Sequence, residues 1–376
     1  MMRQHVSTIL AGALAAALTV VLSAGTAHAG LAEIEAAQQA NAGLVNQWKF
    51  EGASDATRLD DSKGSQDLTR IAGAGGTVDP DGVALSGDET TYTPSVNDII
   101  FEPGFDGAAS QAYRPSAIPV TVPNMAPGGN GNVVAQSRAG AGLAIDQMYL
   151  TPTLVTVEAV VQTSAFDSLN RFHYILDSRM GAPGSDRLYY LAQQAPDSTR
   201  DGTSNISAHV GTAAPLAVAA SPKIVSNADT NNWYYVVATY DLTATPAVMN
   251  AYSANLTTGG PLVQTVTNFN FVINAASIAT AASARPWGVG MFNINTDDDG
   301  NGVPGEPTDT DGIFRTSGGQ EFFRGSIDNL AMYNNVLSAQ DIANNLAALR
   351  VPEPASVSLL ILGGLAALGF RRRRAG

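Results

Sequence analysis

The stretch FFRGSIDNLAMYNNVLSAQDI, residues 322–342, decides the fold of this chain. Its central part, residues 325–333, alternates with the period of a β-strand. The alternation predicts two faces, with Ile327, Asn329, Ala331 and Tyr333 on one and Asp328, Leu330 and Met332 on the other. Ser338 and Asp341 have the spacing of a capping box, which predicts a helix over 339–349. The chain therefore ends its folded part with a strand and a short capped helix.

Further strands are expected upstream, with turn-forming residues between them and no long segment of helical period. A short helix is expected over 31–42, and residues 71–150, rich in Gly, Pro and Ala, are expected to hold short irregular strands and an insertion. Strands at short spacing without intervening helices favour a sandwich over βαβ units. The expected strands cover residues 44–50, 155–163, 172–178, 187–193, 205–211, 233–240, 247–255 and 266–273.

Three motifs resemble one family. LVNQWKF at 44–50 is followed by Asp61-Ser62-Lys63-Gly64, and the chain closes on the Gly-x-Ile-Asp, Tyr and Leu-Ser pattern of residues 325–338. Together they are similar to the laminin-G-like, concanavalin A-like jelly-roll family. The resemblance implies an all-β sandwich of two antiparallel sheets with a short C-terminal helix, formed by residues 30–350 as one domain.

Both ends of the chain indicate export. Residues 1–29 have a basic start, an apolar run and Ala27-His28-Ala29, which is the pattern of a cleaved signal peptide. The tail, VPEPASVSLLILGGLAALGFRRRRAG at 351–376, has an apolar segment over 355–370. It is either a plain membrane anchor held by cytoplasmic arginines or a processed sorting signal. The residues on which this choice depends are Pro352, Glu353, Pro354, Arg371, Arg372, Arg373 and Arg374.

The tail resembles the PEP-CTERM signal of exported bacterial proteins. That resemblance implies an exosortase-type processing enzyme as partner, transient attachment to the membrane, and delivery to the cell envelope, cell surface or extracellular matrix of a Gram-negative-type bacterium. Whether the processed protein is released or stays attached is open at this stage.

The composition excludes several classes of function. Residues 30–350 hold 15 of the 20 Lys and Arg residues and 32 of the 33 Asp and Glu residues, so this part carries a net charge near −17. Binding to nucleic acid needs clustered Lys and Arg, and is therefore not expected. The chain has no cysteine, which excludes disulfides, thiol nucleophiles and thiolate metal sites.

Calcium is the one cofactor that the sequence suggests, at two places. Asp297, Asp299 and Asn301 have the spacing of the first half of an EF-type loop, but Thr308 stands where a bidentate Glu is needed. The alternative is a solvated acidic loop without metal. The jelly-roll resemblance also implies a structural calcium ligand at Asp328, together with Asp61. The alternative there is that Asp328 accepts hydrogen bonds from backbone donors.

A non-catalytic role is expected. The Glu-x-Asp-x-x-Glu motif of laminarinase-type hydrolases is missing, because Ala, Val and Val follow Glu158. In the pairs Tyr189-Tyr190 and Tyr234-Tyr235 one ring of each should face outward, where it would stack on a sugar or simply cover the sheet. We therefore expect a surface-associated binding or adhesion protein that recognises glycan in the extracellular matrix or biofilm. The alternatives are a secreted glycoside hydrolase of the same fold and a purely structural surface protein.

Overall fold

The computed structural model describes twelve segments of the chain, and the statements below refer to them. They are residues 30–72, 76–78, 90–92, 95–123, 133–145, 153–164, 173–179, 187–194, 203–209, 222–271, 287–291 and 322–350.

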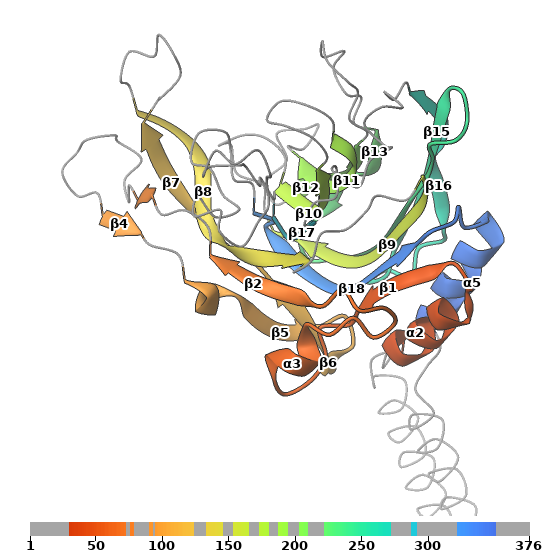
Figure 1. Cartoon of the computed structure of the whole chain (residues 1–376), viewed down its shortest axis with the longest axis horizontal. Helices are drawn as coiled ribbons and strands as arrows, with labels where there is room; N and C mark the ends of the chain where they lie inside the picture. The colour runs from red at the N-terminus through yellow and green to blue at the C-terminus, as the bar shows by residue number, and fades with distance from the viewer. Residues whose placement is uncertain are drawn as a thin grey trace, which may run out of the picture. The chain divides into compact units, whose positions relative to one another are not determined.

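Residues 41–343 form one compact unit, and the described residues on either side, 30–40 and 344–350, belong to a second one that contains helix α2, Gly30–Ala40. The larger unit is a sandwich of two antiparallel sheets (Figure 1), as the sequence predicts. Its strands are β1 Leu44–Trp48, β2 Leu68–Ala72, β3 Gly76–Val78, β4 Thr90–Tyr92, β5 Ile100–Gly104, β6 Gly107–Arg114, β7 Ser116–Pro123, β8 Val133–Ile145, β9 Leu154–Thr163, β10 His173–Arg179, β11 Arg187–Gln194, β12 Thr203–His209, β13 Lys223–Asp229, β14 Trp233–Asp241, β15 Ala247–Asn255, β16 Val263–Phe271, β17 Gly288–Val289 and β18 Gly325–Tyr333.

The first sheet has the order β16-β15-β14-β9-β18-β6-β5, with β1 also paired to β18. The second has the order β13-β12-β11-β10-β17-β8-β7-β3-β4, with β2 paired to β8. Apolar side chains of both sheets meet in one buried core, which includes Trp48, Val157, Leu176 and Trp287. The fold is therefore all-β, with two antiparallel layers around a single core.

The predicted alternation along β18 is wrong at one point. Register with β9 shifts between Ile327 and Asn329, so Asp328 forms a β-bulge. After the bulge, Leu330 and Met332 lie in the same core as Ile327. The simple alternation had placed them on the face opposite to Ile327. One extra residue in the strand turns every later side chain to the other face. Because Asp328 is the extra residue of the bulge, its side chain does not follow the alternation of its neighbours in β18.

The expected irregular insertion at 71–150 needs correction in its described parts. Strands β5 and β6 belong to the first sheet, and β7 and β8 form a long antiparallel pair in the second. Leu143 and Ile145 of β8 are fully buried in the core. Strands β6 and β8 are rich in Ala and Gly, which are depleted in strands, so their apolar pattern was hard to detect.

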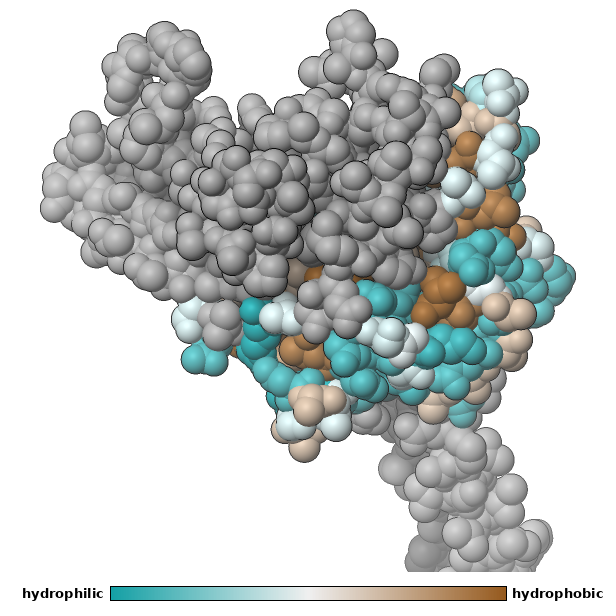
Figure 2. Space-filling view, in the orientation of Figure 1, coloured by the Kyte–Doolittle hydropathy of each residue, from teal (hydrophilic) through white to brown (hydrophobic). Residues whose placement is uncertain are grey.

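Short helices complete the described structure. Helix α5, Ala339–Leu349, begins where predicted: Asp341 N donates to Ser338 Oγ at 3.1 Å, and Ser338 N donates to Asp341 Oδ2 at 3.2 Å. Helix α3, Asp55–Arg58, and the 3₁₀ turn η1, Val96–Asp98, lie in connections. Within the described segments no helix combines the length and apolarity needed to span a bilayer. The coloured surface in Figure 2 is mainly hydrophilic.

Candidate functional site

The functional candidate is a corner of the first sheet where the β5–β6 hairpin meets α3 and the loop that precedes it (Figure 1). We call it the hairpin corner. It combines a buried acidic part with a partly exposed part that holds two guanidinium groups and an aromatic ring. It consists of Glu51, Arg58, Arg70, Phe101, Asp106, Ser110, Gln111 and Asp328.

Asp328 is the centre of the acidic part. Its side chain is fully buried, and the bulge in β18 directs it toward the turn between β5 and β6. One carboxylate oxygen, Oδ2, accepts from the backbone N–H of Phe105 and, at 3.4 Å, from the hydroxyl of Ser110. The other oxygen, Oδ1, is buried and has no hydrogen-bond partner among the described residues. A buried carboxylate oxygen without a donor or cation is costly, so this atom needs an explanation.

The space beside Asp328 exists because residue 104 is a glycine. A Cβ on Gly104 would lie 2.3 Å from Asp328 Oδ2 and 2.6 Å from Ser110 Oγ. Ser110 Oγ also accepts from the N–H of Asp106 at 3.0 Å, which ties the turn together. The hairpin is thus shaped to receive the carboxylate from β18.

The electrostatic surroundings favour the neutral acid or a bound cation. Burial raises the pKa of Asp328 well above its usual value, and the charges of Glu51 and Asp106 raise it further. The hydrogen bonds from Phe105 and Ser110 act in the opposite direction. A hard divalent cation takes carboxylate, carbonyl and water oxygens, and the unpartnered Oδ1 of Asp328 is an oxygen of this kind. Across the described segments, however, no three acidic or histidine side chains converge closely enough to hold a metal by themselves.

Asp61, the expected companion of Asp328, has a different role. Its carboxylate accepts five N–H groups, from the Asn46 side chain and from the backbones of Gln47, Lys63, Gly64 and Gln66, at 2.7 to 3.2 Å. Both oxygens are therefore already bound by protein donors. The geometry makes Asp61 the anchor of its turn, and does not support it as a metal ligand.

The partly exposed half of the corner was missed by the sequence analysis. Phe101 of β5 lies under two guanidinium groups, with Cζ of Arg58 4.7 Å and Cζ of Arg70 5.3 Å from the ring centroid. Arg58 and Arg70 are 43 and 31 residues distant from Phe101, so no local pattern connects them. The available signal was the rarity of basic residues in an acidic chain.

Glu158 is enclosed in the protein and already hydrogen-bonded. It is fully buried on β9, and its two oxygens accept from the hydroxyls of Tyr235 and Tyr333, the latter at 2.7 Å. Tyr234 is also buried, 6% exposed, so neither ring of this pair faces outward as the sequence suggested. The side chains of Tyr189 and Tyr190 lie outside the described set.

The other predicted site residues lie outside the described segments. They are the loop residues Asp297, Asp299 and Asn301 and the tail residues Pro352, Glu353, Pro354 and Arg371 to Arg374. The structure therefore gives no geometry for the EF-type loop.

Comparison with known families confirms the sorting motif. Residues 350–374 match the model of the PEP-CTERM protein-sorting motif. The motif marks an exported protein that an exosortase processes and that is sorted to the cell envelope with membrane anchoring. No curated protein sequence matches the chain.

The chain is also similar to solved structures. Domain 4 of AbnA, a GH43 extracellular arabinanase from Geobacillus stearothermophilus, shares 14% identity, with 80% of this chain and 97% of that one covered and a TM-score of 0.40. The CBM40 of the Ruminococcus gnavus IT-sialidase shares 14%, with 51% and 82% covered and a TM-score of 0.32. The Trypanosoma rangeli sialidase shares 14%, with 81% and 32% covered and a TM-score of 0.36. Similarity at these scores gives no information on the ligand or activity of this chain.

Proposed function

We propose that the protein is an exported, non-catalytic glycan-binding protein of the cell envelope or extracellular matrix, and that the hairpin corner binds the glycan. The observation that carries the proposal is the half-buried Phe101 ring with the guanidinium groups of Arg58 and Arg70 over it. Guanidinium N–H groups are strong directional donors toward sugar oxygens, and an aromatic ring holds them in place. The sorting motif supports the proposal, because it directs the protein to the cell envelope, where polysaccharides occur.

The non-catalytic part of the proposal is supported by Glu158. Glycoside hydrolysis usually needs two carboxyl groups that flank the scissile bond. Glu158 is committed to two tyrosine hydroxyls, and Asp61 to five N–H donors. Asp328 is fully buried behind the hairpin turn. None of these three carboxylates is presented to a sugar.

A structural calcium at Asp328 is part of the proposal. The partnerless oxygen Oδ1 would be one ligand, and the negative charges of Glu51 and Asp106 would favour the ion. Such an ion would stabilise the β5–β6 turn, and with it the strand that carries Phe101. Binding of glycan would then depend on calcium through the shape of the hairpin.

A glycan array, probed with the purified protein in calcium and again in chelator, tests the proposal. We expect binding to a group of envelope or matrix glycans, and we expect Phe101→Ala to weaken it by roughly tenfold, the effect of about 1.4 kcal/mol. The matched control is Ile100→Ala, the neighbouring residue, which is 48% exposed and belongs to no part of the hairpin corner. Absence of binding to every glycan would overturn the proposal, and release of new reducing ends would favour the hydrolase alternative.

A further inference from the structure

We infer that Arg58 binds the carboxylate of an acidic sugar, so that the ligand is a glycan with isolated carboxylate groups. The inference rests on the proposed glycan-binding function and names the class of ligand. Its basis is the difference between the two arginines that share the Phe101 ring.

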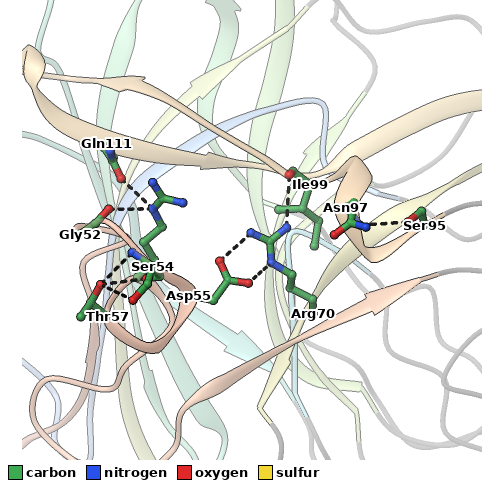
Figure 3. A network of polar contacts seen from close by, with 10 residues as sticks. Gly52, Ser54, Asp55, Thr57, Arg70, Ser95, Asn97, Ile99 and Gln111 are labelled. Carbon is green, nitrogen blue, oxygen red and sulfur yellow. Dashed lines mark hydrogen bonds and ion pairs between the residues drawn. The ribbon is translucent and has the colours of Figure 1, made fainter.

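Arg70 is electrically neutralised by the protein. Its Nε lies 2.5 Å from Asp55 Oδ2 and its Nη2 donates to Asp55 Oδ1 at 2.7 Å, a bidentate ion pair. Its Nη1 faces the carbonyl of Ile99 at 3.4 Å, and Figure 3 shows the guanidinium between these two groups. The positive charge of Arg70 is therefore compensated by Asp55, and Arg70 is a poor site for an anion from outside the protein.

Arg58 keeps its charge. Its Nε donates to two neutral oxygens, the carbonyl of Gly52 at 2.8 Å and the side-chain carbonyl of Gln111 at 3.0 Å (Figure 3 shows both acceptors). Among the described residues no carboxylate pairs with Arg58, and its Nη1 and Nη2 have no acceptor. These two nitrogens form one edge of a planar fork, whose geometry matches the two oxygens of a carboxylate.

Arg58 is also held in position before any ligand arrives. The two Nε hydrogen bonds and the contact with Phe101 restrict its side chain, and the N–H of Gln111 is itself fixed by Glu51 Oε1 at 2.8 Å. A free arginine loses about 2 kcal/mol of rotamer entropy when it is fixed. Here the fold has already restricted the side chain, so a ligand would lose less affinity to ordering.

The net charge of the whole protein limits which acidic glycans can bind. A net charge of −13 repels densely charged polyanions, and residues 30–350 alone are more acidic still. A single carboxylate reaching Arg58 gains the local contact while the rest of the glycan stays neutral. The net negative charge of the protein therefore favours a glycan with sparse uronic-acid-type residues over a sulfated or uniformly charged polymer.

Titration calorimetry with three matched oligosaccharides tests the inference. They carry a terminal glucuronic acid, a terminal glucose or a terminal sulfated glucose on the same neutral chain. We expect the glucuronic acid probe to bind at least roughly tenfold more tightly than the glucose probe, the effect of one charged contact. Arg58→Gln should remove this preference, so that the glucuronic acid and glucose probes bind with affinities within about twofold of each other.

Two further variants separate binding from folding. Arg58→Lys keeps the charge but lacks the fork, so the preference should fall substantially while the melting temperature stays close to that of the native protein. Arg114→Gln is the matched control, since Arg114 lies on the same hairpin but already pairs with Glu102 at 3.1 Å. It should leave the preference unchanged.

The outcomes are distinct. Equal binding of the glucuronic acid and glucose probes, a stronger response to the sulfated probe, or an intact preference in Arg58→Gln would overturn the inference while glycan binding stands. Failure of all three probes, together with an empty glycan array, would overturn the proposed function itself.

Discussion

Asp61 and Asp328 are buried aspartates in the same β-sandwich, 4% and 0% exposed, yet their carboxylates have opposite surroundings. Each is accommodated by a glycine: a Cβ on Gly64 would lie 2.5 Å from Asp61 Oδ2, and one on Gly104 would lie 2.3 Å from Asp328 Oδ2. Asp61 accepts five N–H donors, whereas Asp328 has an oxygen with no partner among the described residues.

The difference shows that burial and residue type do not decide the role of an aspartate. Asp61 lies at the start of a turn whose own backbone N–H groups fold around it, so its charge is compensated locally. Asp328 lies in the bulge of a strand, and its donors come from a hairpin more than 200 residues earlier. The first carboxylate holds a loop together, whereas the second keeps one oxygen without a partner among the described residues.

Of the variants that test this contrast, Asp61→Ala should change the free energy of unfolding most. Asp61→Ala should lower the free energy of unfolding by at least about 3 kcal/mol, because it leaves five N–H donors without their acceptor. The loss should be the same with and without calcium. Chemical denaturation in both conditions measures it.

Asp60→Ala is the matched control, because Asp60 is the exposed neighbour of Asp61. Its effect should stay within about 0.5 kcal/mol. If Asp61→Ala proved neutral, or destabilised the protein only when calcium was present, the contrast between the two aspartates would be wrong.

Calcium should give the second-largest effect, through Asp328. At a free calcium concentration one hundred times the Kd, the native protein should gain about 2.7 kcal/mol in its free energy of unfolding. Asp328→Asn should lose this gain, because the neutral amide is a much poorer calcium ligand. Differential scanning calorimetry with calcium and with chelator gives both values.

In chelator at neutral pH, Asp328→Asn should be at least as stable as the native protein, since it removes an acidic group whose ionised form is destabilised by burial. That sign is the opposite of the one expected for Asp61. A calcium response that persists in Asp328→Asn would place the ion elsewhere, with the EF-type loop around Asp297 as the next position to vary.

The fold was largely predictable because its strongest strands have simple patterns. Strand β18 and helix α5 follow from the period of two at 325–333 and from the capping box at Ser338. The bulge at Asp328 was not predictable, because it arises from register with β9 and leaves no mark in the local sequence. Strand β8 was missed because it fills its place with small residues, whose pattern is weak.

The candidate site was predictable only in part. A family resemblance selected Asp328 and Asp61 together as calcium ligands, which stays a prediction, and the five donors around Asp61 come from a loop geometry that residue types do not define. The pairing of Arg58 with Phe101 depends on the β5–β6 hairpin reaching the loop before β2, a long-range contact without periodicity. The sequence alone shows only that basic residues are rare in this chain, so each of them is a candidate for a specific interaction.

The smallest expected effect is on how the stability of the protein depends on pH, through Asp328. The pKa of Asp328 is raised in the folded protein by burial and by Glu51 and Asp106, whereas the unfolded chain should titrate near about 3.9. In chelator, the folded state keeps its proton while the unfolded state releases it, so stability should fall as pH rises from about 4 through the folded-state pKa. Above that pKa the loss is complete and constant.

Asp328→Asn isolates this contribution, because every other acidic group titrates in both proteins. The difference in free energy of unfolding between variant and native protein should grow in favour of the variant as pH rises from about 4 toward 7. Saturating calcium should reverse the trend, since the ion prefers the ionised carboxylate and competes with the proton. Parallel pH profiles in chelator would mean that Asp328 titrates normally, and the unpartnered oxygen would then no longer argue for a cation at the hairpin corner.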